Sequence, residues 1–186
     1  MAKIYAFMAN GTEEVECLAV VDVLRRAGLD TVLVSINEGA EVCGSHGIRL
    51  SCDTVIGETD LSDADVLFLP GGMPGTTHLA GCEALQTALL SQQKKGKRIA
   101  AICAAPSVLG ELGLLSGKEA TCYPGFEDKL AGARYTKQGV VTDGNITTAR
   151  GLGYALDLGL ELIRLLLSEA EAGRIREAIQ YDQNHA

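Results

Sequence analysis

One cysteine of the chain sits where an apolar strand should pass directly into a helix. Residues 99–106 read IAAICAAP, with Cys103 at the corner and Pro106 suited to the first helical turn. The exposed amides of a helix N-terminus favour a thiolate, so this position predicts a lowered pKa for Cys103. Such a corner is the sulfur counterpart of a nucleophile elbow. On this segment alone, a cysteine merely buried at a strand end stays open as the alternative.

A carboxylate near the N-terminus could act as the acid–base partner of this cysteine. Residues 13–16 read EEVE and open a helical pattern. Glu13 and Glu14 suit the helix dipole and need no other explanation. Glu16 shares its helical face with Ala19 and Val20, so partial desolvation should raise its pKa. A protonated Glu16 could donate a hydrogen bond to a thiolate and carry protons. Without the cysteine, a solvated first-turn acid would be the preferred interpretation.

A glycine-rich loop supplies a third set of polar groups. Residues 70–75 read PGGMPG and follow an apolar strand. Their backbone amides could form an oxyanion hole together with the amide of Ala104, although a plain tight turn would look the same. The loop lacks the Lys-Ser/Thr ending of a phosphate-binding P-loop. The histidines at 46, 78 and 185 show no metal-ligand spacing, and only His46, in a glycine-flanked loop, is placed where it could line a site.

Composition excludes several classes of function. The net charge of −8, from 16 basic and 24 acidic residues, argues against nucleic acid as a partner. No apolar stretch approaches the roughly 20 residues that span a bilayer. The first residues read as a strand and not as a cleavable signal, so export is not expected. None of the six cysteines forms a C-x-x-C pair, which predicts free thiols in a reducing, cytoplasmic compartment and no bound metal.

Apolar strands and amphipathic helices alternate along residues 1–186, which predicts one α/β domain with a mostly parallel central sheet between helices. Strands are expected at 3–8, 31–36, 65–69, 98–103, 121–123, 140–141 and 146–148, with a hairpin or meander at 38–53. Helices are expected at 12–27, 83–95, 104–114, 125–130, 153–167 and 169–179, the first with Thr12 as N-cap. Sites in such sheets lie beyond the C-terminal ends of the strands, which selects residues 10–16, 70–75 and 103–106.

These segments together resemble the ThiJ/PfpI superfamily, in the branch that holds the parkinsonism-associated deglycase and bacterial YajL. The resemblance covers nearly the whole chain and rests on NGTEEVE at 10–16, VVDVLRRAG at 20–28, LPGG at 69–72 and AAICAAP at 100–106. It implies a flavodoxin-like three-layer sandwich, usually a homodimer. It also implies that Cys103 is the reactive thiol, that Glu16 is its carboxylic partner, and that Gly72 and Ala104 supply backbone amides.

The activities that the resemblance implies need no cofactor. They are the conversion of methylglyoxal to lactate, the removal of early glycation adducts from proteins or nucleotides, and holdase-like protection under stress. An enzyme acting on small reactive carbonyls is the first hypothesis. A redox-sensing stress chaperone, in which Cys103 is oxidised without turnover, is the alternative, because an accessible reactive thiol suits both.

The sequence departs from the family pattern around the expected site. Tyr123 stands where some members carry a histidine, and its hydroxyl could border the substrate pocket or belong to a partly buried ring. His46 stands near an arginine of other members, and Leu152 lies in GLGY at 151–154, where many have Gly-Pro-Gly-Thr. Ala104 replaces the histidine of the protease-like branch, which argues against peptidase activity. These departures concern substrate preference and leave the Cys103–Glu16 pair intact.

Overall fold

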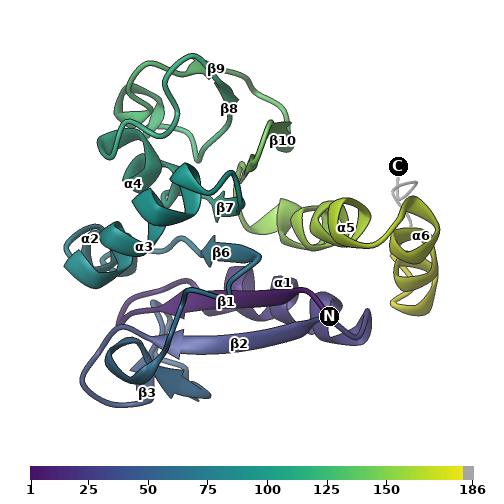
Figure 1. Ribbon diagram of the computed structural model, residues 1–186, viewed down its shortest axis with the longest axis horizontal. Helices are drawn as coiled ribbons and strands as arrows, with labels where there is room; N and C mark the ends of the chain where they lie inside the picture. The colour runs from purple at the N-terminus through teal and green to yellow at the C-terminus, as the bar shows by residue number, and fades with distance from the viewer. Residues whose placement is uncertain (182–186) are drawn as a thin grey trace.

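The computed structural model describes residues 1–181. The elements run in the order β1 (Lys3–Met8), α1 (Glu14–Arg26), β2 (Asp30–Ser35), β3 (Glu41–Cys43), β4 (Arg49–Ser51), β5 (Thr54–Val55), η1 (Ile56–Glu58), β6 (Val66–Leu69), α2 (Gly75–Ala80), α3 (Glu83–Lys94), β7 (Arg98–Ile102), α4 (Pro106–Glu111), β8 (Glu119–Ala120), η2 (Glu127–Lys129), β9 (Arg134–Tyr135), β10 (Val140–Asp143), β11 (Ile146–Ala149), η3 (Leu152–Tyr154), α5 (Ala155–Leu166) and α6 (Glu169–Ala178). Figure 1 shows their arrangement.

A seven-stranded sheet in the order β10-β11-β7-β6-β1-β2-β5 forms the centre of the molecule. Every neighbouring pair is parallel except β10 and β11, which the Gly144-Asn145 turn joins as an antiparallel hairpin. The parallel strands that follow one another at the centre, β2-β1-β6-β7-β11, have the flavodoxin-like order. The expected α/β sandwich with a mostly parallel sheet is confirmed.

Alternate residues of β1 face the two helical layers. Ile4, Ala6 and Met8 pack with α1, α5 and α6 on one face, while Tyr5, Phe7 and Ala9 pack with α2, α3 and α4 on the other. In Figure 1, α5 and α6 extend away from the side that holds α2, α3 and α4. A strand buried on both faces reads as a continuous apolar run, which is why the sequence pattern located it.

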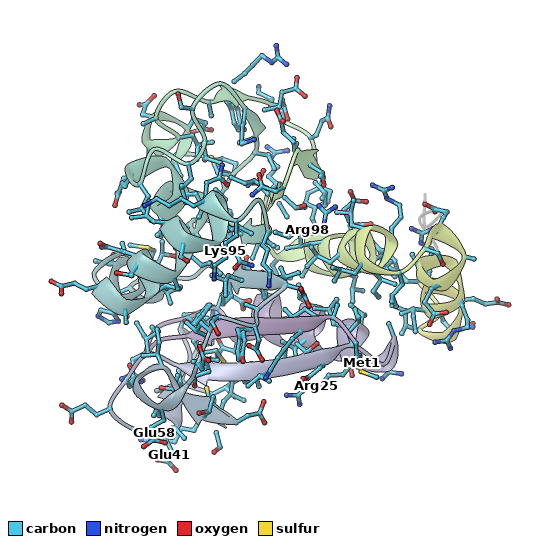
Figure 2. All side chains as sticks on the ribbon, viewed as in Figure 1. Met1, Arg25, Glu41, Glu58, Lys95 and Arg98 are labelled. Carbon is cyan, nitrogen blue, oxygen red and sulfur yellow. The ribbon has the colours of Figure 1, made fainter. Side chains whose placement is uncertain are left out.

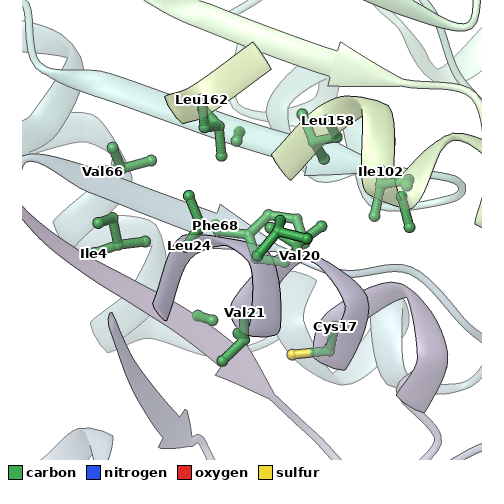
Figure 3. Packing of buried hydrophobic residues seen from close by; sticks show 14 of the residues in the cluster. Ile4, Cys17, Val20, Val21, Leu24, Val66, Phe68, Ile102, Leu158 and Leu162 are labelled. Atoms are coloured by element: carbon green, nitrogen blue, oxygen red, sulfur yellow. The ribbon is translucent and has the colours of Figure 1, made fainter. Parts of the chain in front are cut away.

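Helices α1 and α5 cross at close range on one face of the sheet. Gly159 of α5 makes this possible, because a Cβ there would collide with Val23 of α1. Figure 3 shows the side chains that meet around this crossing, with Val20 and Leu24 from α1 and Leu158 and Leu162 from α5. Because α1 also carries Glu16, this packing fixes the position of a candidate site residue.

Several local expectations were wrong. Glu13, not Thr12, caps α1, since the Glu13 side chain accepts the N–H of Glu16 and the Thr12 hydroxyl binds the N–H of Ala9 instead. Residues 121–123 form no strand. A two-residue parallel bridge between β8 and β9 lies nearby. The helix expected at 104–114 is shorter, and the one expected at 125–130 is a single 3₁₀ turn.

Other expectations agree with the structure. The hairpin expected within 38–53 is the antiparallel pair of β3 and β4. The basic residues of KKGKR at 94–98 lie at the end of α3 and in the turn into β7, which Lys95 and Arg98, labelled in Figure 2, flank. All six cysteines are free. Within residues 1–181, none of the helices has the length and apolarity needed to cross a bilayer.

Candidate active site

Three central strands bring the candidate residues to one edge of the sheet. Glu16 lies in the first turn of α1, the helix that follows β1, while Gly71 and Gly72 follow β6 and Cys103 follows β7. These strands are parallel neighbours, so their C-terminal ends meet at the same edge. Because β1 lies between β2 and β6, the chain reverses its direction of winding there, and such points form ligand-binding crevices in open α/β sheets.

Cys103 occupies a sharp turn between β7 and α4. Its φ angle is +64°, in the left-handed region that residues with a Cβ rarely adopt. Backbone hydrogen bonds hold the turn on both sides: the Cys103 N–H donates to Ala149 O at 2.9 Å, and the Tyr123 N–H donates to Cys103 O at 2.8 Å. Pro106 takes the first position of α4, as the sequence predicted. The expected elbow is therefore present at this residue.

Glu16 points from α1 into the interior, where it is only 1 % exposed. Its Oε2 accepts the Gly71 N–H at 3.0 Å, and its carboxyl also meets the Cys103 side chain and the backbone N–H of Leu152. Burial raises the pKa of Glu16 to about 7, although the hydrogen bonds from Cys103, Gly71 and Leu152 oppose this. Glu16 can thus hold or release a proton near neutral pH, as the sequence predicted.

The pKa of Cys103 moves in the opposite direction from the sequence prediction. Burial, with the adjacent Glu16 carboxylate, raises the pKa of the thiol to about 12, and the amides of Ala104 and Gly72 offset only part of this. The prediction weighed the helix amides but not the loss of water or the nearby charge. Two buried acids in contact cannot both ionise readily, so between these two pKa values the pair holds one proton and one negative charge. A thiolate forms when Glu16 takes that proton.

The glycine-rich loop closes the site against Cys103 and Glu16. A Cβ on Gly71 would lie 2.6 Å from Cys103 Cβ and 2.6 Å from Glu16 Oε2, so a larger residue could not stand there. Gly72 has a φ of +88°, which suits glycine. The backbone N–H groups of Gly72 and Ala104 both reach the Cys103 sulfur. The structure thus brings together the four residues that the sequence assigned to catalysis and the oxyanion hole.

Tyr123 and His46 lie at the edge of this group. The Tyr123 ring is 51 % exposed and faces Gly151, and its hydroxyl has no hydrogen-bond partner within residues 1–181. The His46 side chain is 68 % exposed and is held by Glu14, with Nδ1 3.3 Å from Glu14 Oε2. Within residues 1–181, neither side chain has a hydrogen bond or ion pair to Cys103 or Glu16, and a role for them in the substrate pocket stays a prediction.

One group of side chains in residues 1–181 places potential metal-ligand atoms within 4.8 Å of one another: Glu13, Glu14 and His46. Hydrogen bonds account for this arrangement. Glu14 accepts from the Ser45 hydroxyl and the His46 N–H, while Glu13 accepts from the Glu16 N–H. We therefore assign no metal to it.

Sequence reasoning missed the Leu152 backbone as part of the site. Its N–H reaches Glu16 because β11 runs parallel to β7, with Ala149 beside Ile102, so the segment after β11 lies next to Cys103. In the sequence, the 151–154 segment stands out only as a departure from the family pattern. A backbone donor leaves no signature in side-chain chemistry, and only the strand pairing reveals it.

A cysteine with positive φ at a strand-to-helix corner, a buried carboxyl partner and two convergent amides on a flavodoxin-like sheet define an α/β protein with a candidate cysteine nucleophile. The family model described as the DJ-1/PfpI family matches residues 2–165, and the chain belongs to that family.

Known relatives cover the chain to different extents. Protein DJ-1 homolog B of Arabidopsis thaliana is 39% identical over 91% of the chain but 39% of its own length, so the chain spans about two fifths of that relative. A Caenorhabditis elegans relative, named glutathione-independent glyoxalase DJR-1.2, is 31% identical over 83% of the chain and 82% of its own length. The solved structure of oxidized Toxoplasma gondii DJ-1 superposes with a TM-score of 0.94 at 33% identity, covering 97% of this chain and 99% of the other.

Proposed function

We propose that this protein is a cofactor-independent glyoxalase or deglycase that acts on reactive carbonyls through Cys103. The observation that carries the proposal is the contact of the buried Glu16 carboxyl with the Cys103 side chain, next to the amides of Gly72 and Ala104. Nucleophile, proton carrier and oxyanion donors are the three parts that addition to a carbonyl needs. The name of the Caenorhabditis elegans relative supports the same reaction class.

With methylglyoxal, the first step is addition to the aldehyde carbon. Glu16 takes the thiol proton, the Cys103 sulfur attacks C1, and a C–S bond forms as the carbonyl π electrons move to oxygen. The Gly72 and Ala104 amides lie beside the sulfur and can donate to this oxyanion. Glu16 then gives the former thiol proton to the oxyanion, which yields a hemithioacetal and leaves the Glu16 carboxylate free to act as a base.

The second stage moves hydrogen from C1 to C2. Glu16 removes the C1 proton to give an enediol-like species and then returns a proton to C2. C1 is oxidised to a thioester while C2 is reduced to an alcohol, so no external oxidant or reductant is needed. Water cleaves the thioester, releasing lactate and restoring the thiol. A carboxyl whose pKa is about 7 suits both removal and return of a proton near neutral pH.

The same pair could act on early glycation adducts of proteins or nucleotides, since these contain the same carbon skeleton. In that reaction water replaces the amine at the former aldehyde carbon, and the overall outcome is hydrolysis. The exposed site edge at Tyr123 and Leu152 leaves room for a substrate attached to a larger molecule.

Six free cysteines support a reducing compartment, and the cytoplasm is the location we propose.

A redox-sensing chaperone is the second candidate. Cys103 is partly exposed, and a protonated Glu16 could donate a hydrogen bond to an oxygen added to the sulfur. The structure of the Toxoplasma gondii relative is described as oxidized. In this function Cys103 would be oxidised once per cycle and would not turn over a carbonyl.

Product counting separates the two functions. Purified protein is incubated with excess methylglyoxal, and lactate is measured per mole of protein. We expect many equivalents from the wild-type protein and none above background from Cys103→Ser. Lactate at or below one equivalent, together with Cys103-dependent protection of a client protein from aggregation, would replace the enzyme proposal with the chaperone.

A further inference from the structure

The first turn of α1 holds more buried negative charge than the proposed chemistry uses. Glu13, Glu14 and Glu16 are all buried, yet only Glu16 contacts the cysteine. Among residues 1–181, no lysine or arginine pairs with either of the other two, and His46 is the one basic side chain near them. Burying a carboxylate without a buried cation beside it is costly, so the place of Glu13 next to a reactive pair calls for a physical account.

Glu13 is bonded to the site through both its backbone and its side chain. Its backbone N–H donates to Gly71 O at 2.9 Å, and its Oε2 accepts the Glu16 N–H at 2.5 Å. The Gly71 carbonyl belongs to the same peptide as the Gly72 N–H, which reaches Cys103. Glu13 therefore fixes the plane of the peptide that donates to the sulfur, and its carboxylate lies on the side of Glu16.

Few charged or titratable groups face Glu16 besides Glu13. Cys103 approaches from the turn after β7, and the buried thiol of Cys17 lies on the same helix. Glu13 in turn faces His46, whose Nδ1 is 3.7 Å from Glu13 Oε1 and which is largely exposed. Within the described chain, a negative charge on Glu13 thus acts on Glu16 without a buried cation between them.

We propose that Glu13 is a positioning residue of this site, whose carboxylate keeps the shared proton on the Cys103–Glu16 pair and whose N–H orients the Gly72 amide. The role of Glu13 in catalysis rests on the proposed function, but its effect on the protonation of the Cys103–Glu16 pair can be tested without turnover. Burial is the largest cause of the raised pKa of Glu16, and the negative charge of Glu13 adds to it. A proton on the pair relieves the repulsion between the two carboxylates.

Glu14 provides a matched control in the same helical turn. Its carboxylate turns toward the β3–β4 hairpin, where it accepts the Ser45 hydroxyl at 3.2 Å and the His46 N–H at 3.1 Å. Gly44 leaves space for it, since a Cβ there would lie 2.6 Å from Glu14 Cδ. Glu14 carries the same charge and similar burial as Glu13, but its contacts lead away from Glu16.

The test is the pH dependence of Cys103 modification by iodoacetamide, followed by peptide mass spectrometry in wild type, Glu13→Gln and Glu14→Gln. Glutamine keeps an oxygen that can accept the Glu16 N–H but removes the charge. In wild type, the rate of Cys103 alkylation should rise with pH around neutrality. We expect the midpoint of this rise to fall by about half a pH unit or more in Glu13→Gln. Glu14→Gln should keep the wild-type midpoint, and so should Glu13→Asp, which retains the charge and is a good N-cap.

An unchanged midpoint in Glu13→Gln, or an equal fall in Glu14→Gln, would overturn the inference. Glu13→Asp controls for a structural effect of changing this residue. If its midpoint shifted too, the effect would come from a disturbed start of α1, and the inference would again be overturned. Because alkylation needs no carbonyl substrate, a protein that shows the expected shift but forms no lactate would refute the proposed function and leave this inference standing.

Discussion

The backbone N–H of Cys103 donates to the carbonyl oxygen of Ala149 across 2.9 Å. This bond continues the β7–β11 pairing one residue beyond the end of β7. With the bond from Tyr123 N–H to Cys103 O, it holds the cysteine at a φ of +64°. Such a conformation costs roughly 1–3 kcal/mol and persists only where the surroundings fix it. The strand pairing thus places the sulfur above the sheet edge.

Cys103 should be the most reactive of the six thiols near neutral pH. Cys82 is the matched comparison, because it caps the N-terminus of α3 and is partly exposed, but it has no partner like Glu16. We expect iodoacetamide to modify Cys103 about tenfold faster than Cys82 near pH ~7, because Glu16 can take the thiol proton as the sulfur reacts and Cys82 has no such base beside it. Peptide mass spectrometry after brief labelling measures both sites. If Cys82, Cys43 or Cys122 reacted first, the strand-to-helix turn at Cys103 would not make this thiol the reactive one.

Glu16 should lower the stability of the fold as the pH rises toward neutrality. Its pKa is about 7 in the folded protein against 4.5 in its unperturbed state, so the folded chain binds the proton more tightly. The contribution is fully present below pH ~4.5 and is lost as pH rises through about 7, by up to about 3 kcal/mol.

Glu16→Gln removes this titration. Urea unfolding of wild type and variant at about pH 4.5 and pH 7.5 should therefore show the variant gaining relative stability at the higher pH. The comparison between the two proteins cancels the other titrating groups. A stability difference that stays constant between these pH values would mean that Glu16 is not desolvated in solution.

The crossing of α1 and α5 predicts opposite effects for two helical glycines. Gly159→Ala would push a Cβ into Val23, and we expect it to lower the free energy of unfolding by about 1–3 kcal/mol. Gly173→Ala in α6 meets nothing within 4 Å, so it should raise that energy by up to about 1 kcal/mol through helix propensity. Thermal and urea denaturation measure both changes. Equal effects would show that the close crossing does not exist.

The family resemblance and two exposed apolar side chains predict a two-fold dimer. Val15 on α1 and Ile48 between β3 and β4 are both exposed, and the hairpin is bonded to the start of α1 through Ser45 N–H and Thr12 O. We expect sedimentation at micromolar concentration to give a dimer that Val15→Glu and Ile48→Glu convert to monomer. Leu90→Glu, which changes an exposed leucine on α3, should leave the dimer intact. A wild-type monomer would contradict the prediction.

The sequence located the parts of the site that depend on the chain's own pattern. The apolar run into Cys103, the proline at 106 and the glycines after β6 predicted the elbow and its loop, because strand ends and turns carry strong local signals. Parallel pairing then brought Glu16, Gly72 and Ala104 together as expected. Fold and site were predictable because sites in such sheets occupy one edge.

The rest depends on tertiary contacts that no local pattern records. Helix α2 has the sequence GTTHLA, which contains poor helix formers, and it begins where Gly75 is packed against Gly11 and Thr12 in the loop after β1. The bridge between β8 and β9 is two residues long on each side, too short for a periodic signal. The direction of the Cys103 pKa shift depends on burial and on the charge of a residue 87 positions away, not on the helix start alone.

The most direct measurement of the central claim is lactate formation from methylglyoxal by Glu16→Gln, followed alongside the covalent adduct on Cys103. Glutamine can still donate a hydrogen bond to the sulfur, but it cannot carry a proton from C1 to C2. We expect the variant still to form the Cys103 adduct, because losing the Glu16 charge lowers the pKa of the thiol and so offsets the loss of the base, while lactate production falls by about 10²-fold or more. Wild-type turnover by Glu16→Gln would contradict it, because Glu16 would then not be the proton carrier.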